Sequence, residues 1–93
     1  NTPLVTGIQN VYPNPFTGST TIELNIKENP QNYKLSIYNI KGEMVYQVSG
    51  YAKGSISRNW DGKDNKGNKL SVGVYLLSFQ VDSSNYTRKL ILK

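Results

Sequence analysis

Residues 60–81 read WDGKDNKGNKLSVGVYLLSFQV. Almost every residue from 61 to 68 either accepts a positive φ or hydrogen-bonds its own backbone, which is typical of a long, pinned turn. After Gly73, apolar side chains occupy every second position and give a strand one wholly apolar face; they are Tyr75, Leu77, Phe79 and Val81. The stretch therefore predicts a loop, opened by the only Trp of the chain, that folds over one end of a β core.

Turn signals divide the rest of the chain into short strands with no helical periodicity. Strands are expected at residues 8–12, 20–27, 33–38, 44–48, 55–60, 74–81 and 86–93, with polar loops at 28–32 and 49–54. The clearest alternation predicts that Ile22, Leu24 and Ile26 point inward while Thr21, Glu23, Asn25 and Lys27 face water. An immunoglobulin-like, all-β sandwich of about seven antiparallel strands accounts for this pattern better than a barrel does.

Local signals also suggest boundaries and corners. Pro13 and Pro15 end the first strand because proline removes ladder donors, and Phe16 is expected to enter the core. Gly42 is expected to supply a positive φ in the connection at 39–43. Residues 1–7 read as a linker and residues 8–93 as one domain, which we expect to be a piece of a longer protein because no initiator Met opens the chain.

The composition excludes several classes of function. The 93 residues include no Cys and no His, which excludes disulfides, thiol and Ser-His catalysis and the usual zinc sites. Eleven Lys and Arg against six Asp and Glu give a net charge of +5, which indicates either a solvated basic surface or an anionic partner such as lipopolysaccharide or an acidic protein. No nucleic-acid motif is present, and no apolar run approaches the roughly 20 residues that span a bilayer.

The remaining candidate chemistry has structural alternatives. Asp61, Asp64, Asn65 and Asn68 carry oxygens suited to calcium, but their spacing is not that of an EF-hand and such side chains also form Asx turns, so calcium binding stays open. Tyr33 and Tyr75 belong to the core pattern, whereas other tyrosines could offer sugars a stacking face; these are Tyr38, Tyr46, Tyr51 and Tyr86. The six carboxylates suggest no acid–base pair, so we expect neither an enzyme nor a cofactor.

Four motifs occur together and in order. Residues 12–16 read YPNPF, residues 35–45 read LSIYNIKGEMV, residues 60–70 read WDGKDNKGNKL and lead to GVY at 73–75, and residues 88–93 read RKLILK. With these motifs, residues 11–93 resemble the type A C-terminal sorting domains of proteins exported by the type IX secretion system of Bacteroidetes-type bacteria. Each motif is weak alone, whereas the set in this order and spacing is specific.

The resemblance implies a seven-stranded immunoglobulin-like domain at the C-terminus of a larger cargo, recognised by the outer-membrane translocon. It implies export through the periplasm to the cell surface or medium, where a sortase removes the domain and the cargo is attached to anionic lipopolysaccharide. The recognition residues would be Gly73, Tyr75, Lys89, Leu90, Ile91, Leu92 and Lys93. The structural motif residues would be Pro13, Asn14, Pro15, Phe16, Gly42, Trp60, Asp61, Gly62, Asp64 and Gly67.

Edge strands can recruit a partner by strand addition, and this is a physical way in which a translocon could recognise the domain. We hypothesise that residues 87–93 form an exposed terminal strand that a partner pairs with, while the corner at 73–75 holds the neighbouring strand in place. Two other function classes fit the same sequence: a carbohydrate-binding or adhesin-type module, and a passive structural spacer.

Overall fold

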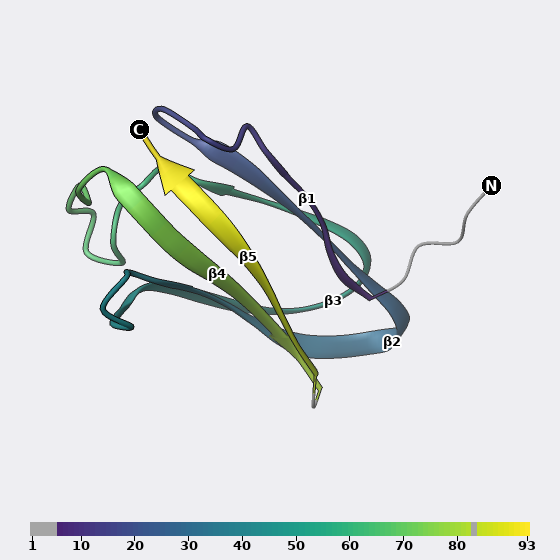
Figure 1. Ribbon diagram of the computed structural model, residues 1–93. Helices are drawn as coiled ribbons and strands as arrows, with labels where there is room; N and C mark the ends of the chain where they lie inside the picture. The colour runs from purple at the N-terminus through teal and green to yellow at the C-terminus, as the bar shows by residue number, and fades with distance from the viewer. Residues whose placement is uncertain (1–5, 83) are drawn as a thin grey trace.

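Two long strands that bend in the middle organise the whole molecule. The computed structural model describes residues 6–82 and 84–93. Its five strands are β1 (Gly7–Tyr12), β2 (Thr20–Tyr38), β3 (Met44–Trp60), β4 (Gly73–Val81) and β5 (Ser84–Leu92). The first part of β2 pairs with β1 and its last part pairs with β4, while β3 follows β2 along both parts. One hydrogen-bonded sheet is thereby folded over on itself (Figure 1).

The fold yields two layers that face each other across the core. One layer holds β1 with residues 20–26 of β2 and 54–60 of β3. The other holds residues 44–52 of β3, residues 31–38 of β2, β4 and β5. Every ladder between these strands is antiparallel. The molecule is therefore the predicted immunoglobulin-like sandwich, with seven strand segments carried on five continuous strands.

The loops predicted at 28–32 and 49–54 are wrong, because both stretches lie inside strands. Polar residues and Gly suggested turns there, yet the two strands bend together, and their ladder resumes at Gln31 opposite Ala52. Within the bend, the ladder shifts register between Ile26 and Gln31, and Gly54, the ladder partner of Ile26, takes a φ of 82°. A second shift lies outside the bend, between Ile37 and Tyr38. A paired bend of this kind carries no local turn signature in either strand.

The core is formed by the inward faces that the alternation predicted. Its members include Ile22, Leu24 and Ile26 of β2 and Leu77, Phe79 and Val81 of β4, all at most 2% exposed. Burying such side chains contributes about 1.5–3 kcal/mol each. The outward assignment of Asn25 is wrong, since this residue is buried where β2 is flanked on both sides, by Gly7 of β1 and Ser55 of β3.

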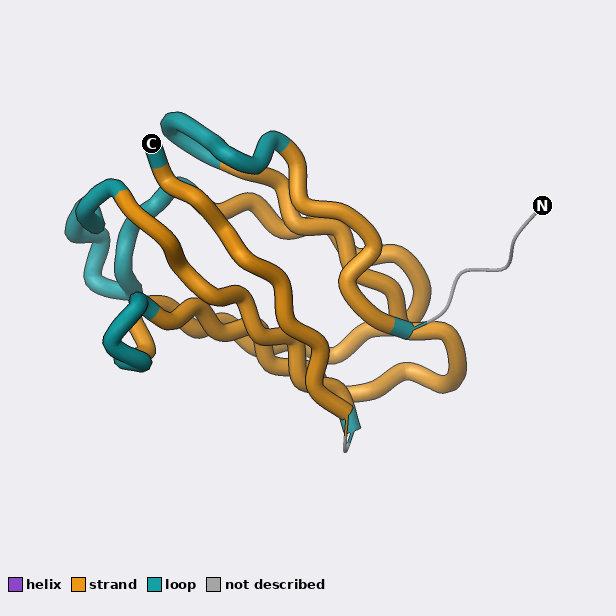
Figure 2. Tube along the Cα trace, viewed as in Figure 1, coloured by secondary structure: helices purple, strands orange, loops and turns teal. Residues whose placement is uncertain are grey.

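The connections gather at two ends of the sandwich, shown as teal segments in Figure 2. The end that we call the C-terminal pole contains residues 13–19, 39–43, 61–72 and Lys93. The N-terminal pole contains Gly7, the bends of β2 and β3, and Asp82 at the end of β4. Residues 1–5 of the predicted lead-in lie outside the described residues, and Gly7 already belongs to β1.

At the N-terminal pole, one aromatic ring fixes the approach of β2 to β3. Tyr33 and Gly50 are directly opposite in the ladder, and a Cβ at Gly50 would lie 2.7–2.9 Å from the Tyr33 ring and hydroxyl. The same hydroxyl accepts hydrogen bonds from the Arg58 guanidinium at 2.8 and 3.1 Å. The ring is 4% exposed and packs edge-on against Phe79. Glycine is thus the residue that fits opposite Tyr33.

Candidate functional site

The proline corner at residues 13–16 is bound directly to the last strand. The backbone N–H of Phe16 donates to Ile91 O at 2.9 Å, and the N–H of Lys93 donates to Phe16 O at 2.8 Å. The side-chain amide of Asn14 donates to Lys89 O at 2.8 Å and accepts from the N–H of Ile91 at 3.0 Å. These four bonds form a clasp between the corner and β5, which we call the β5 clasp.

The β5 clasp corrects the expectation of an open edge at residues 89–93 of the hypothesised strand 87–93. The edge groups of β5 from Lys89 to Lys93 already bond to the corner, so a partner strand cannot pair with them while the clasp is closed. In the corner, the groups that bond to this edge are the backbone N–H and C=O of Phe16 and the side-chain amide of Asn14. Sequence alone did not suggest it, because the partners are more than seventy residues apart.

The side chains of the terminal strand divide into two sets. Leu90 and Leu92 are buried in the core, at 0% and 9% exposed. Lys89 and Lys93 are exposed, and Ile91 is partly exposed on the outer face. Among residues 89–93, this second set is the one whose side chains can touch a partner of the folded domain. Leu90 and Leu92 instead fix the position of the strand.

An aromatic cluster anchors the start of β4 under the same pole. The ring of Trp60 lies 5.6 Å from Phe16 and 5.8 Å from Tyr75 between centroids, and its Nε1–H donates to Lys63 O at 2.9 Å. The Tyr75 hydroxyl donates to Ser71 O at 2.6 Å, and burial raises the pKa of this tyrosine. Gly73, with a φ of 149°, allows the chain to leave the loop and enter β4. Gly73 and Tyr75 therefore position the start of β4, and both also line a cavity between this strand and the 39–43 connection.

The loop at 61–72 is held by its own side chains, as an Asx turn would be. Asp64 accepts hydrogen bonds from the N–H groups of Lys66 and Asn68, each at 2.9 Å. The bond from the backbone of Asn68 is the main cause that lowers the pKa of Asp64. Asn65 extends the pairing outward, since its amide exchanges two hydrogen bonds with the backbone of Gln47 at 2.8 and 2.9 Å.

Glycine joins this loop to the terminal strand. Gly62 has a φ of 75°, and a Cβ there would come within 3.4 Å of the Leu92 side chain. Gly67 and Gly42 also take positive φ values, as the turn chemistry predicted for Gly42. Asp61 is exposed and forms an ion pair with Lys63 at 3.8 Å. The loop that carries the motif residues 60–67 thus packs against the end of β5 through the contact of Gly62 with Leu92.

Metal binding finds no support in the described part of the chain. Within residues 6–82 and 84–93, no three Asp or Glu side chains gather in a way that could hold a metal ion. The same described ranges contain no helix with the length and apolarity of a membrane span. Every carboxylate that the loop offers is committed to a turn or to a neighbouring lysine.

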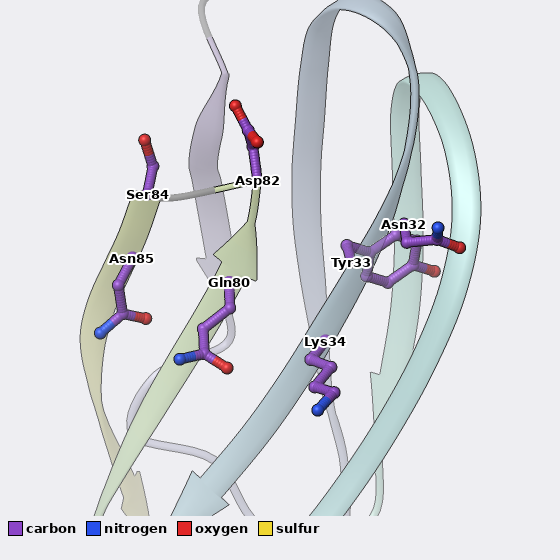
Figure 3. Close-up of a pocket in the computed structure, with 7 residues that line it drawn as sticks. All are labelled: Asn32, Tyr33, Lys34, Gln80, Asp82, Ser84 and Asn85. Atoms are coloured by element: carbon purple, nitrogen blue, oxygen red, sulfur yellow. The ribbon is translucent and has the colours of Figure 1, made fainter.

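A polar cavity of about 330 Å³ lies at the opposite, N-terminal pole. Figure 3 shows its lining, which comes from β2, β4, β5 and the residue after β4: Asn32, Tyr33, Lys34, Gln80, Asp82, Ser84 and Asn85. Its one aromatic ring, Tyr33, is buried and turned toward β3, so the cavity offers no flat aromatic face to a sugar. Tyr51 is exposed, whereas Tyr38, Tyr46 and Tyr86 are only partly so, and none of the ring contacts among described residues joins two exposed tyrosines.

Two solved bacterial structures have a fold similar to this one. No curated protein sequence matches the chain. Among solved structures, dimeric latent PorU of Porphyromonas gingivalis is similar with a TM-score of 0.81 and 24% identity, over 95% of this chain and 9% of that one. PorZ, described as an essential surface component of the type-IX secretion system of the same organism, is similar with a TM-score of 0.67 and 20% identity, over 94% of this chain and 11% of that one.

These two likenesses support the fold, and this chain spans only about a tenth of each of those proteins. The family model for the secretion system C-terminal sorting domain matches residues 10–93, which is nearly the whole sequence. The motifs that carried the resemblance all fall inside the matched range. The chain therefore belongs to the family of type IX secretion system C-terminal sorting domains.

Proposed function

We propose that this domain is a non-catalytic signal that directs an attached cargo through the type IX outer-membrane translocon to the cell surface. Membership of the sorting-domain family supports this role. The observation that carries it is the β5 clasp, which holds the terminal strand in one position and leaves Lys89, Ile91 and Lys93 projecting from it. A receptor can therefore contact these three side chains in a fixed arrangement, which we call the recognition row.

The residues expected to be decisive for recognition act in two ways under this proposal. Lys89, Ile91 and Lys93 contact the translocon, because their side chains leave the core. Four others hold that row in place: Gly73, Tyr75, Leu90 and Leu92. Tyr75 and the two leucines are buried in the core, and Gly73 starts the neighbouring strand. Exposed lysines that have no acidic partner among the described residues also suit a receptor with acidic groups.

We further propose that the chain from Gly7 to Lys93 forms the C-terminal domain of a larger cargo and that the residues before Gly7 link the two. A surface sortase would cut in this linker and attach the cargo to anionic lipopolysaccharide. The geometry favours such a division, because β1 starts at the N-terminal pole and the recognition row lies at the C-terminal pole. Cutting before Gly7 would leave the recognition row undisturbed.

The test fuses residues 1–93 to a periplasm-directed fluorescent reporter in a bacterium with a working type IX system. Surface and medium fluorescence should require the domain and should be lost when residues 90–93 are deleted. That deletion also removes two core leucines, so a second variant, Lys89→Glu with Lys93→Glu, changes only exposed side chains. The matched control is Lys34→Glu with Lys53→Glu, which makes the same charge change at exposed positions away from the terminal row.

Export lost with the terminal pair and kept with the control pair is the expected result. A reporter that stays in the periplasm with the intact, folded domain would contradict the proposal. Glycan screening of the domain would then test the carbohydrate-binding class, which the described tyrosines do not favour.

A further inference from the structure

Exposed apolar side chains are concentrated at one place on the described surface. Seven large hydrophobic residues are strongly exposed within the described ranges, and five of them come from the 39–43 connection, the start of β3 and residues 72–76. We call these five the apolar patch: Ile40 (81% exposed), Met44 (52%), Val72 (71%), Val74 (43%) and Leu76 (45%). Clusters of this kind on a small domain mark interaction sites more often than scattered apolar residues do.

The five residues are contiguous although they come from three segments. Ile40, Val72 and Val74 line one cavity of about 310 Å³ between the 39–43 connection and the start of β4. Met44 and Leu76 flank Tyr38 on its two sides, as its partners in the ladders with β3 and β4. The patch thus extends from a hollow at the C-terminal pole onto the outer face of β4.

Folding of the domain does not account for these side chains. The inward face of β4 is already apolar, and its outward positions become polar at Ser78 and Gln80. Val74 and Leu76 depart from that alternation only next to the hollow. Apolar surface left in water forgoes about 25 cal/mol per Å², so the pattern indicates a surface that becomes covered.

The rim of the apolar patch is basic and continuous with the recognition row. Lys89 is the ladder partner of Leu76, and Ile91 is the ladder partner of Val74. Lys41 lines the hollow beside Ile40. No acidic side chain of the described residues pairs with Lys41 or Lys89, because the one ion pair there joins Lys63 to Asp61. Glu43, the acid in the lining, is held by the Asn39 amide at 2.9 Å.

We propose that the apolar patch docks onto a protein of the export apparatus whose surface inserts an apolar side chain into the hollow and sets acidic groups opposite Lys41 and Lys89. This inference rests on the proposed sorting function and adds its mode: the receptor reads the side-chain face of β4 and β5. Strand addition at the terminal edge is blocked by the β5 clasp. A second copy of the domain would bring like charges together, and a hollow suits a protruding protein side chain better than it suits a lipid surface.

The test uses the same reporter fusion with Val74→Thr and Leu76→Thr, which keep strand propensity and remove apolar surface. Gln80→Thr, on the same face of the same strand, is the matched control. Urea unfolding of the isolated domain 1–93 and of each variant would show that all fold alike. We expect exported reporter to fall about tenfold or more with the double variant and to stay unchanged with Gln80→Thr.

A photo-crosslinking residue in place of Val72 then identifies what covers the hollow during export. Crosslinks to a protein of the export apparatus, lost on Lys89→Glu, are the expected result. Crosslinks only to lipid, or only to another copy of the domain, would overturn the proposal. So would normal export of the folded Val74→Thr, Leu76→Thr domain. Failure of the unsubstituted domain to export its reporter would overturn the sorting function itself, and the two failures are thereby distinguished.

Discussion

The side chain of Asn14 binds the backbone around Ile91, accepting from its N–H at 3.0 Å and donating to Lys89 O at 2.8 Å. A side-chain amide has the same donor and acceptor as a peptide group, so Asn14 occupies the place of one residue of a neighbouring strand. Together with the two backbone bonds of Phe16, it converts the terminal edge of the sheet into a closed one at this end. The proline motif and the basic terminal motif are therefore one structural unit.

Asn14→Ala should lower the free energy of unfolding by about 1–2 kcal/mol, because two hydrogen bonds to β5 are lost. Asn14→Asp should cost more at pH 7, since it places a carboxylate against Lys89 O, and should recover toward acid pH as the carboxyl is protonated. Urea unfolding measures both. Thr17→Ala is the control, in the same corner and exposed. Equal stability of Asn14→Ala and the control would contradict the role of the clasp.

Gly50→Ala should destabilise the domain by about 1–3 kcal/mol, because the new Cβ would press on the buried Tyr33 ring and the core is already packed. In a Tyr33→Leu background the same change should cost much less, since the ring is gone. Urea midpoints of the four proteins give the comparison, with Ser49→Ala as an exposed neighbouring control. An identical cost in both backgrounds would show that the strain arises elsewhere.

Tyr75→Phe should lower the free energy of unfolding by about 1 kcal/mol through loss of the bond to Ser71 O. Burial raises the pKa of Tyr75, so the stability that its neutral hydroxyl contributes is full below about pH 10 and is lost as the pH rises through the raised value. The substitution should therefore reduce the alkaline loss of stability. The measurement is the free energy of unfolding of the unsubstituted domain and of Tyr75→Phe from pH 8 to pH 11. If the two pH profiles ran parallel, the hydroxyl would have no role.

The loop at 61–72 should respond to acid through Asp64. Hydrogen bonds from Asn68 and Lys66 lower the pKa of its carboxyl, so their contribution is full above about pH 3.9 and is lost as the pH falls through the lowered value. Amide proton shifts of Lys66 and Asn68, followed by NMR, should titrate with a midpoint below the ordinary Asp range. Asp64→Asn should abolish this transition. A midpoint at the ordinary value would refute the turn-capping role.

Much of the fold could be read from local pattern. The period-two apolar positions of β4 and the alternation at 20–27 correctly predicted the inward residues, and the Trp60 segment correctly predicted a pinned loop over one end of the core. These features depend on side chains within a few positions of each other, which a sequence displays directly. The family resemblance, now shown by the match over residues 10–93, rested on the same segments.

What escaped prediction depends on contacts between distant segments. The bends of β2 and β3 exist only because two strands curve together, and residues such as Asn29 and Gly50 resemble turn formers when taken singly. Asn14 stands between two prolines that suggested only the end of a strand, while its partner lies in β5. The apolar patch likewise combines Ile40, Val72 and Leu76, which neither adjacency nor periodicity joins.

The β5 clasp also has a consequence for the order in which the chain can fold. During synthesis the proline corner leaves the ribosome more than seventy residues before the segment it binds. Until residues 89–93 have been synthesised, Leu90 and Leu92 are missing from the core. The proline corner, the Trp60 cluster and the start of β4 then lack these packing partners. Closure is therefore among the most non-local and latest steps available to this chain. A chain truncated before residue 90 could not form the β5 clasp. A closed clasp is therefore found only in chains whose synthesis has passed this point.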